Sequence, residues 1–287
     1  MSVISITGLT HFYNKGTPFE SVAIHDINLE IQKGELLAII GHTGSGKSTL
    51  IQHFNGLLKP DKGVVKFNGS DIWENKKHIR EVRFNVGLCF QYPEYQLFEE
   101  TVYKDIAFGP QNMKLDESEI DRRVRKAAEF VGLKDELLEK SPFDLSGGEK
   151  RRAAIAGVLA MEPSVLIMDE PTAGLDPRGR EKIIQLIKKY REETGSTVVL
   201  VSHSMEDVAR LADRILVMEN GSPVMLSSVK SVFSQRSRLV SMGLNVPQIA
   251  QVFSGLRSRG LPVSADIFTV EEGVKELLRV SQGRGIQ

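Results

Sequence analysis

Cysteine, net charge and long apolar runs are all scarce in this 287-residue chain. Its single cysteine, Cys89, excludes an intrachain disulfide framework and a zinc site built from cysteines. With 37 Lys and Arg against 37 Asp and Glu, the formal net charge is zero, so bulk charge does not indicate a nucleic-acid binder. No apolar run approaches the ~18 residues of a membrane span. The first residues carry no basic, apolar leader, so we expect neither a spanning helix nor a signal peptide.

Apolar residues make up 41% of the chain and charged residues 26%, which is typical of a globular protein. Apolar runs of strand length predict strands, and stretches of helical periodicity lie between them. We therefore expect an α/β fold with a largely parallel sheet, in which the first two strands belong to an antiparallel element. The expected strands are Val3–Thr7, Ile24–Ile31, Leu36–Ile40, Val64–Phe67, Phe84–Phe90, Val165–Met168, Thr197–Val201 and Ile215–Met218.

Two segments depart from this alternation and indicate the domain organisation. Residues 92–160 are helical in pattern and predict a subdomain, in which Asp116–Glu119 is typical of a capping box at a helix start. We assign residues 1–221 to one domain. Residues 222–287 contain short helix signals, including the box Thr269–Glu272, and predict a small, mostly helical C-terminal domain.

A glycine-rich loop follows the Leu36–Ile40 strand and precedes a helical pattern. It matches G-x-x-x-x-G-K-[ST], in which glycines let backbone N–H groups converge on a phosphate and the next helix adds its positive N-terminal dipole. Lys47 would reach the β- and γ-phosphates of a nucleotide, and the Ser48 hydroxyl would hold Mg²⁺. The expected phosphate-binding residues are Gly41, His42, Thr43, Gly44, Ser45, Gly46, Lys47, Ser48 and Thr49.

Two adjacent carboxylates follow the predicted strand Val165–Met168. Asp169 would lie at the carboxyl edge of the sheet, where open α/β sheets bind ligands, and would hold the metal directly or through its water. Glu170 would polarise a water at the γ-phosphate. An apolar strand that ends in Asp-Glu is common, so this interpretation depends on its pairing with the phosphate-binding loop.

A second glycine-rich helix start lies at Leu145–Glu149, where Ser146 and Glu149 have capping-box spacing. A capping box does not require Gly147 and Gly148, because glycine is unfavourable in a first helical turn. These glycines therefore indicate a second close approach of an anion. A phosphate-binding loop with this second element resembles the ATP-binding cassette (ABC) ATPases, whose signature sequence is usually LSGGQ. Glu149 replaces the usual Gln, and its effect on the site stays open.

The resemblance extends over residues 1–221 and implies roles for further residues. Gln91 matches the Q-loop glutamine, which reaches the metal in this family, and His203 matches the switch histidine, which contacts the γ-phosphate. Ala173–Asp176 matches the D-loop. Tyr13 matches the aromatic residue that stacks on adenine, and Phe12 and Phe19 are the alternatives.

The resemblance also implies a P-loop ABC nucleotide-binding fold with an antiparallel β subdomain and a helical subdomain, and a head-to-tail dimer. Both phosphate-binding elements cannot serve one nucleotide within one chain of this family. The signature residues of one subunit would therefore face ATP held by the other: Ser146, Gly147, Gly148 and Glu149.

Four longer stretches resemble the energy-coupling factor (ECF) transporter ATPases, most of all the second of that family's two ATPase types. That resemblance implies ATP and Mg²⁺ as cofactors, uptake of vitamins or metal ions as the function, and a location at the cytoplasmic face of the cell membrane. The implied partners are a second ATPase subunit, usually a different chain although a homodimer is the alternative, a transmembrane coupling protein, and indirectly a substrate-binding membrane subunit. The stretches are Gly16–Glu20, Gln52–Pro60, Gln91–Thr101 and Ala154–Pro163.

We expect Gln91–Thr101 to contact the coupling protein. Its aromatic residues would supply contact area, and its carboxylates would select a basic partner, in keeping with the arginine-bearing helices of ECF coupling proteins. The alternative interpretation is an ordinary amphipathic loop. The residues in question are Tyr92, Tyr95, Leu97 and Phe98, with Glu94, Glu99 and Glu100.

Three other functions fit parts of the sequence. A conventional ABC importer ATPase would share the same motifs and differ in its membrane partners. A non-transport ABC ATPase that acts on DNA or ribosomes would need a coiled-coil arm, zinc modules or two cassettes, whereas this chain has one phosphate-binding loop and one signature. A P-loop GTPase or kinase would lack LSGG and commonly carry N-K-x-D, which we do not find.

Overall fold

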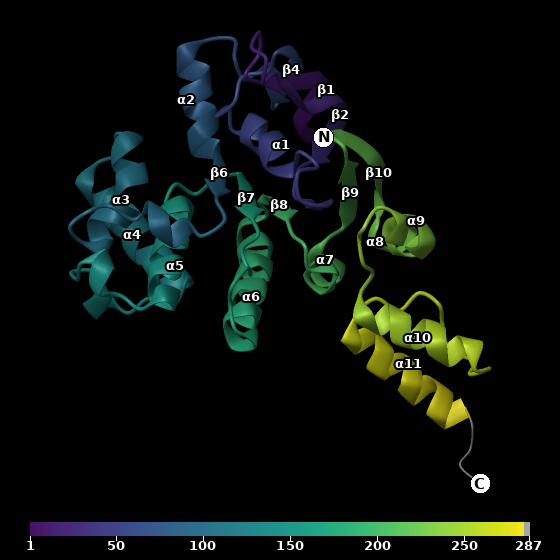
Figure 1. The fold of residues 1–287 in the computed structure, drawn as a ribbon. Helices are drawn as coiled ribbons and strands as arrows, with labels where there is room; N and C mark the ends of the chain where they lie inside the picture. The colour runs from purple at the N-terminus through teal and green to yellow at the C-terminus, as the bar shows by residue number, and fades with distance from the viewer. Residues whose placement is uncertain (284–287) are drawn as a thin grey trace.

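The computed structural model describes residues 1–283 and contains two sheets flanked by helices (Figure 1). The larger sheet has the strand order β10-β9-β3-β8-β7-β6, with all neighbours parallel except the β9–β10 hairpin. Its strands are β3 (Leu36–Ile40), β6 (Val86–Cys89), β7 (Val165–Asp169), β8 (Thr197–Val201), β9 (Arg214–Glu219) and β10 (Ser222–Ser228). The smaller sheet is antiparallel, in the order β2-β1-β4-β5, and consists of β1 (Ser2–Tyr13), β2 (Ser21–Gln32), β4 (Lys62–Phe67) and β5 (Ser70–Asp71).

The helices form three groups around the larger sheet (Figure 1). Beside the strands lie α1 (Lys47–Phe54), α2 (Lys76–Asn85), α6 (Pro177–Thr194) and α7 (Met205–Leu211). The helical subdomain, at the left of Figure 1, contains the 3-10 turns η1 (Pro93–Gln96), η2 (Asp135–Leu137) and η3 (Pro142–Asp144) and the helices α3 (Val102–Asn112), α4 (Glu117–Phe130) and α5 (Gly147–Leu159). The C-terminal group, at the right, is α8 (Val229–Phe233), α9 (Arg236–Ser241), α10 (Gln248–Ser258) and α11 (Val270–Gly283).

Strands β3, β6, β7 and β8 of the larger sheet are buried throughout, which explains their continuous apolar runs. In β7, Leu166 and Met168 pack into the cluster that contains the helical subdomain, whereas Val165 and Ile167 pack into the cluster that contains α1 and the smaller sheet. The predicted α/β class and parallel sheet are confirmed. Cys89 is buried as a small hydrophobe, and burial raises the pKa of its thiol to about 12.

Two predicted segments differ in type from the structure, and β1 runs to Tyr13, well past the predicted strand end at Thr7. The expected strand Phe84–Phe90 begins only at Val86, because the preceding residues belong to α2, which the Asn75 side chain caps by accepting the backbone N–H of His78. The expected helical segment after Gly221 begins with a strand: β10 pairs with β9, and helices follow only from Val229. Of the helices within residues 1–283, none is long and apolar enough to cross a bilayer.

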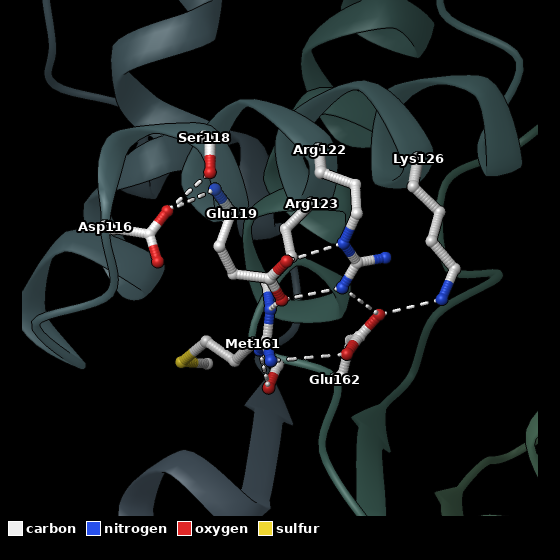
Figure 2. Close-up of polar contacts among 8 residues, drawn as sticks. All are labelled: Asp116, Ser118, Glu119, Arg122, Arg123, Lys126, Met161 and Glu162. Atoms are coloured by element: carbon white, nitrogen blue, oxygen red, sulfur yellow. Dashed lines mark hydrogen bonds and ion pairs between the residues drawn. The ribbon is translucent and has the colours of Figure 1, made fainter.

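Capping residues begin the helices where the sequence indicates. Ser146 with Glu149, and Thr269 with Glu272, form the reciprocal hydrogen bonds of a capping box. The Asp116–Glu119 box is only half formed. Asp116 accepts the backbone N–H of Glu119, but the Glu119 carboxylate binds the guanidinium groups of Arg122 and Arg123 instead (Figure 2).

A charged network joins the helical subdomain to the start of β7. Arg123 donates to the carbonyl of Met161, and the Glu162 carboxylate lies 2.7 Å from the Lys126 ammonium and 3.6 Å from the Arg122 guanidinium (Figure 2). These bonds tie α4 to the segment that follows α5.

Candidate active site

The loop between β3 and α1 is shaped by three glycines. Gly46 has a φ of 93°, and a Cβ there would lie 2.6 Å from a methyl carbon of Ile24. A Cβ on Gly41 would lie 2.4 Å from the carbonyl oxygen of Met218. Gly44 also has a positive φ, 81°, but a Cβ there would meet nothing within 4 Å. The loop is thus packed tightly on its inner side and open on its outer side.

Lys47 begins α1 with its side chain folded back into this loop. Its ammonium donates to the carbonyl oxygens of Gly41 at 2.7 Å and His42 at 2.9 Å, and burial lowers its pKa. The helix start at Gly46 has no side-chain cap, whereas each of α2 to α7 has one. The first N–H groups of α1 and its dipole are therefore available to an anion.

Ser48 and Asp169 meet at the mouth of the loop. The Ser48 hydroxyl donates to the Asp169 carboxylate at 3.1 Å, across 121 positions of sequence. Asp169 ends β7 and is buried, and this desolvation raises the pKa of its carboxyl. A hydroxyl oxygen beside a carboxylate is a donor set that suits Mg²⁺.

Glu170 directly follows β7 and lies beside the end of β8 and the segment after it. It has a φ of 49°, and its backbone N–H donates to the carbonyl of Val201 at 2.9 Å. One carboxylate oxygen accepts the backbone N–H of His203 at 3.3 Å, and the other lies 3.3 Å from Nε2 of the same residue. Desolvation raises the pKa of Glu170 to about 7, and desolvation also lowers the pKa of His203.

Tyr13 stands beside the loop at the end of β1, with its ring partly exposed. Its hydroxyl lies 3.1 Å from the Thr49 hydroxyl, and its ring packs edge-on against the His11 imidazole, with centroids 5.0 Å apart. His11 in turn packs against His53, whose pKa burial lowers to about 4. Contacts with His11 and Thr49 therefore hold Tyr13 in place, while part of its ring stays exposed.

Two groups of predicted site residues lie apart from this constellation. Gln91 is exposed, and within residues 1–283 no hydrogen bond joins it to Ser48 or Asp169. The signature residues begin α5 in the helical subdomain, away from α1 (Figure 1). A Cβ on Gly147 would meet nothing within 4 Å, so this helix start faces outward. The Glu149 carboxylate accepts both the N–H and the hydroxyl of Ser146, and these bonds lower its pKa.

One buried carboxylate beside the site is not predicted from the sequence. Asp207 is 1% exposed; it accepts the Thr172 hydroxyl at 2.9 Å and Nε of Arg180 at 2.9 Å, and Arg180 also binds the Ser204 hydroxyl. These contacts join the segments that follow Glu170 and His203. The spacing of Ser204 and Asp207 resembles a helix cap, which accounts for the start of α7 but gives no sign of the link to Thr172.

Fold and site together define a P-loop ATPase of the ATP-binding cassette type. The family model for ABC transporters matches residues 24–173. Two curated relatives are both named "Energy-coupling factor transporter ATP-binding protein EcfA2". The one from Caldanaerobacter subterraneus subsp. tengcongensis is 52% identical over 98% of this chain and 98% of the relative, and the one from Clostridium tetani is 55% identical over 96% of each.

Solved structures agree with these sequence relatives. CbiO1 from Clostridium perfringens, described as part of the ABC transporter complex cbiONQ, superposes with a TM-score of 0.74 and 40% identity over 88% of this chain and 99% of its own. The ATP-binding cassette MJ0796, bound to ADP and Pi, gives a TM-score of 0.71 at 29% identity over 79% of this chain and 98% of its own. The chain belongs to the ABC transporter family, among the energy-coupling factor transporter ATP-binding proteins.

Proposed function

We propose that this chain is the ATP-hydrolysing subunit of an energy-coupling factor importer, acts at the cytoplasmic face of the cell membrane, and powers uptake of vitamins or metal ions through a membrane coupling protein. One observation carries the proposal: three features meet at one edge of the larger sheet. They are the start of α1, which has no side-chain cap, the hydrogen-bonded pair Ser48 and Asp169, and Glu170 with its raised pKa. The end-to-end similarity to EcfA2 proteins supports the transporter type.

The residues present fit ATP and Mg²⁺. The open side of the loop at Gly44 and the free N–H groups of α1 suit the phosphates, and Lys47 can turn from its loop carbonyls to a phosphate oxygen. Ser48 and Asp169 would hold the metal, and Gln91 would reach it from η1's side once the subunit closes. When bound, ATP would supply the phosphoryl group, and Mg²⁺ would neutralise its negative charge.

Three side chains of this site have separate roles toward water and nucleotide. Glu170, with a pKa of about 7, is half ionised near neutral pH and can take a proton from an attacking water. His203 holds the glutamate through its backbone N–H, and its lowered pKa keeps the imidazole neutral, so it can donate one hydrogen bond and accept another. Tyr13 would present its free face to the adenine ring.

A dimer completes the proposal. The outward-facing helix start at Ser146–Gly148 would contact nucleotide held by a second ATPase subunit, because it lies apart from the loop of its own chain. That second subunit is a different chain in our proposal, and a homodimer is the alternative outcome. Sedimentation of a Glu170→Gln variant with ATP, alone and with candidate partner ATPases, distinguishes the two.

The proposed docking site for the coupling protein is a groove of about 840 Å³ between α2, η1, α3 and α5. Phe98 and Phe108 expose apolar surface at this groove, and their rings pack edge-on 5.1 Å apart. Asp105 at its wall accepts the backbone N–H groups of Phe98 and Glu99, and burial raises its pKa. Other lining residues include Arg80, Arg83, Phe84, Leu97 and Met161.

The carboxylates of this segment do not all face a partner. Glu94 lies against the buried Arg151, and Glu100 binds Lys104 at 2.5 Å. Of the three predicted carboxylates, Glu99 is therefore the one that we propose for a basic partner. A charge reversal that includes Glu94 would disturb the interior as well as the groove.

Co-purification from native membranes tests the function. Affinity-tagged chain should bring down a second ATPase, a multi-span coupling protein and a small substrate-binding membrane subunit. A Phe108→Asp variant should lose the membrane subunits and keep ATP binding, whereas Val252→Asp on α10, also exposed, should lose neither. Recovery of a two-protein permease instead would assign the chain to a conventional ABC importer.

A further inference from the structure

Arg151 is a buried arginine near the start of α5 that the proposed hydrolysis does not use. Its side chain is 4% exposed and contacts two segments outside its own helix. One terminal nitrogen donates to the carbonyl of Ala173 at 2.8 Å, Nε lies 3.7 Å from the Glu94 carboxylate, and the guanidinium carbon lies 6.0 Å from the centre of the Tyr92 ring. The signature helix, the turn after Gln91 and the D-loop thus meet at one guanidinium.

The Arg151–Glu94 ion pair is too long for a hydrogen bond. In the part of the chain that the structure describes, Nε and Nη2 of Arg151 and Oε2 of Glu94 have no hydrogen-bond partner, although all three atoms are buried. A charge-assisted hydrogen bond is about 2.8 Å long. A relative shift of about 1 Å between η1 and α5 would therefore convert a loose ion pair into a hydrogen-bonded one, which would satisfy buried polar atoms that now lack a partner.

The backbone around this contact brings two of the three segments together directly. Tyr92 has a φ of 55°, in the left-handed region, and its ring edge lies 3.7 Å from the position that a Cβ on Gly174 would occupy. The D-loop therefore lies against the ring of Tyr92, while Arg151 binds the carbonyl of its first residue, Ala173. Movement of one segment must displace the other two, because packed groups transmit small shifts.

We propose that Arg151 is a positioning residue that carries movement of the Gln91–Glu94 turn to the signature helix and the D-loop. The proposal rests on the proposed ATPase function of the dimer, and it adds the residue through which these segments move together. Arginine suits the task because its planar fork serves a carbonyl and a carboxylate on different edges at once, whereas a lysine ammonium is a single point.

Steady-state ATPase measurements on the full chain in its purified complex test this role. We expect Arg151→Lys and Glu94→Gln each to lower kcat about tenfold, in the range of ordinary coupling between sites, and to leave KM for ATP within about twofold. The double variant should be no slower than the slower single variant, because both changes break one link. Arg122→Lys, which alters an exposed ion pair on α4, is the matched control and should keep wild-type kcat.

Thermal unfolding of each variant separates positioning from folding. An unchanged kcat in Arg151→Lys, additive losses in the double variant, or a kcat that falls only in step with the folded fraction would each overturn the proposal. If Arg151→Lys unfolds, Glu94→Gln, which keeps size and polarity, decides alone by the same criteria. Absence of ATPase activity in the wild-type complex would instead overturn the proposed function.

Discussion

Both carboxylate oxygens of Glu170 are directed at one residue, His203, although 33 positions separate the two in sequence. One oxygen accepts the histidine's backbone N–H, and the other lies 3.3 Å from its Nε2. Parallel pairing of β7 with β8, which sets Asp169 opposite Val201, brings the two residues together at the same sheet edge. The sheet register therefore aligns the proposed base with its neighbour.

Replacing Glu170 with Gln should abolish most ATP hydrolysis and preserve ATP binding. The amide keeps the size of the side chain but cannot take a proton from water, and general base catalysis typically contributes about 10²- to 10⁴-fold. Phosphate release in single-turnover experiments and nucleotide titration measure the two effects. Turnover close to that of the wild type would contradict the assignment.

Replacing His203 with Ala should lower kcat strongly with little change in the dissociation constant for ATP. A group used mainly in the transition state shows this pattern, whereas a ground-state contact affects binding equally. The backbone N–H that holds Glu170 remains in both His203→Ala and the control His203→Gln. A loss of turnover in either variant therefore comes from the side chain. Equal losses of binding and turnover would make His203 a ground-state or structural residue.

The raised pKa of Glu170 predicts a pH-dependent cost to the stability of the nucleotide-free chain. The folded-state pKa, about 7, lies above the ordinary glutamate value of 4.5, so the folded chain holds the extra proton between these pH values and loses stability as pH rises through them. Glu170→Gln removes this cost, so its stabilising effect should be about 2 kcal/mol larger at pH 8 than at pH 5. Urea unfolding at both pH values measures the difference; an equal effect at both would refute the shift.

Tyr13 should contribute its ring rather than its hydroxyl to nucleotide binding. Stacking of a base on an aromatic side chain is worth about 1–3 kcal/mol, so Tyr13→Ala should weaken ATP binding about 5- to 150-fold. Tyr13→Phe loses the contact with Thr49 but keeps the ring, and should bind ATP nearly as well as the wild type. If Tyr13→Ala binds normally, Phe12 and Phe19 become the residues to examine by the same titration.

Sequence patterns predict the centre of this fold better than its margins. Leu36–Ile40 and Thr197–Val201 are strands with the predicted bounds, because strands buried on both faces must be apolar throughout. The polar helix α2 is not predicted, since only Ile79 and Val82 of its residues are buried. Without α2, the groove wall formed by Arg80 and Phe84 is also missing from the sequence analysis.

The residues of the candidate site also differ in how well the sequence predicts them. Lys47, Ser48, Asp169 and Glu170 belong to contiguous motifs whose chemistry is readable from the residue types, and the structure places them together. The contacts of Arg151 and Asp207 join segments that are distant in sequence. No local pattern encodes such contacts, because they arise only when loops from different strands meet.

The hairpin between β9 and β10 has a consequence for how the chain can be shortened. Gly221 at its turn donates to the carbonyl of Ser45 in the phosphate-binding loop and accepts the backbone N–H of His25. A truncation at residue 221 would therefore remove the strand that holds this turn in place and loosen the loop itself. A minimal catalytic fragment should instead end after Ser228, where the last strand of the sheet is complete.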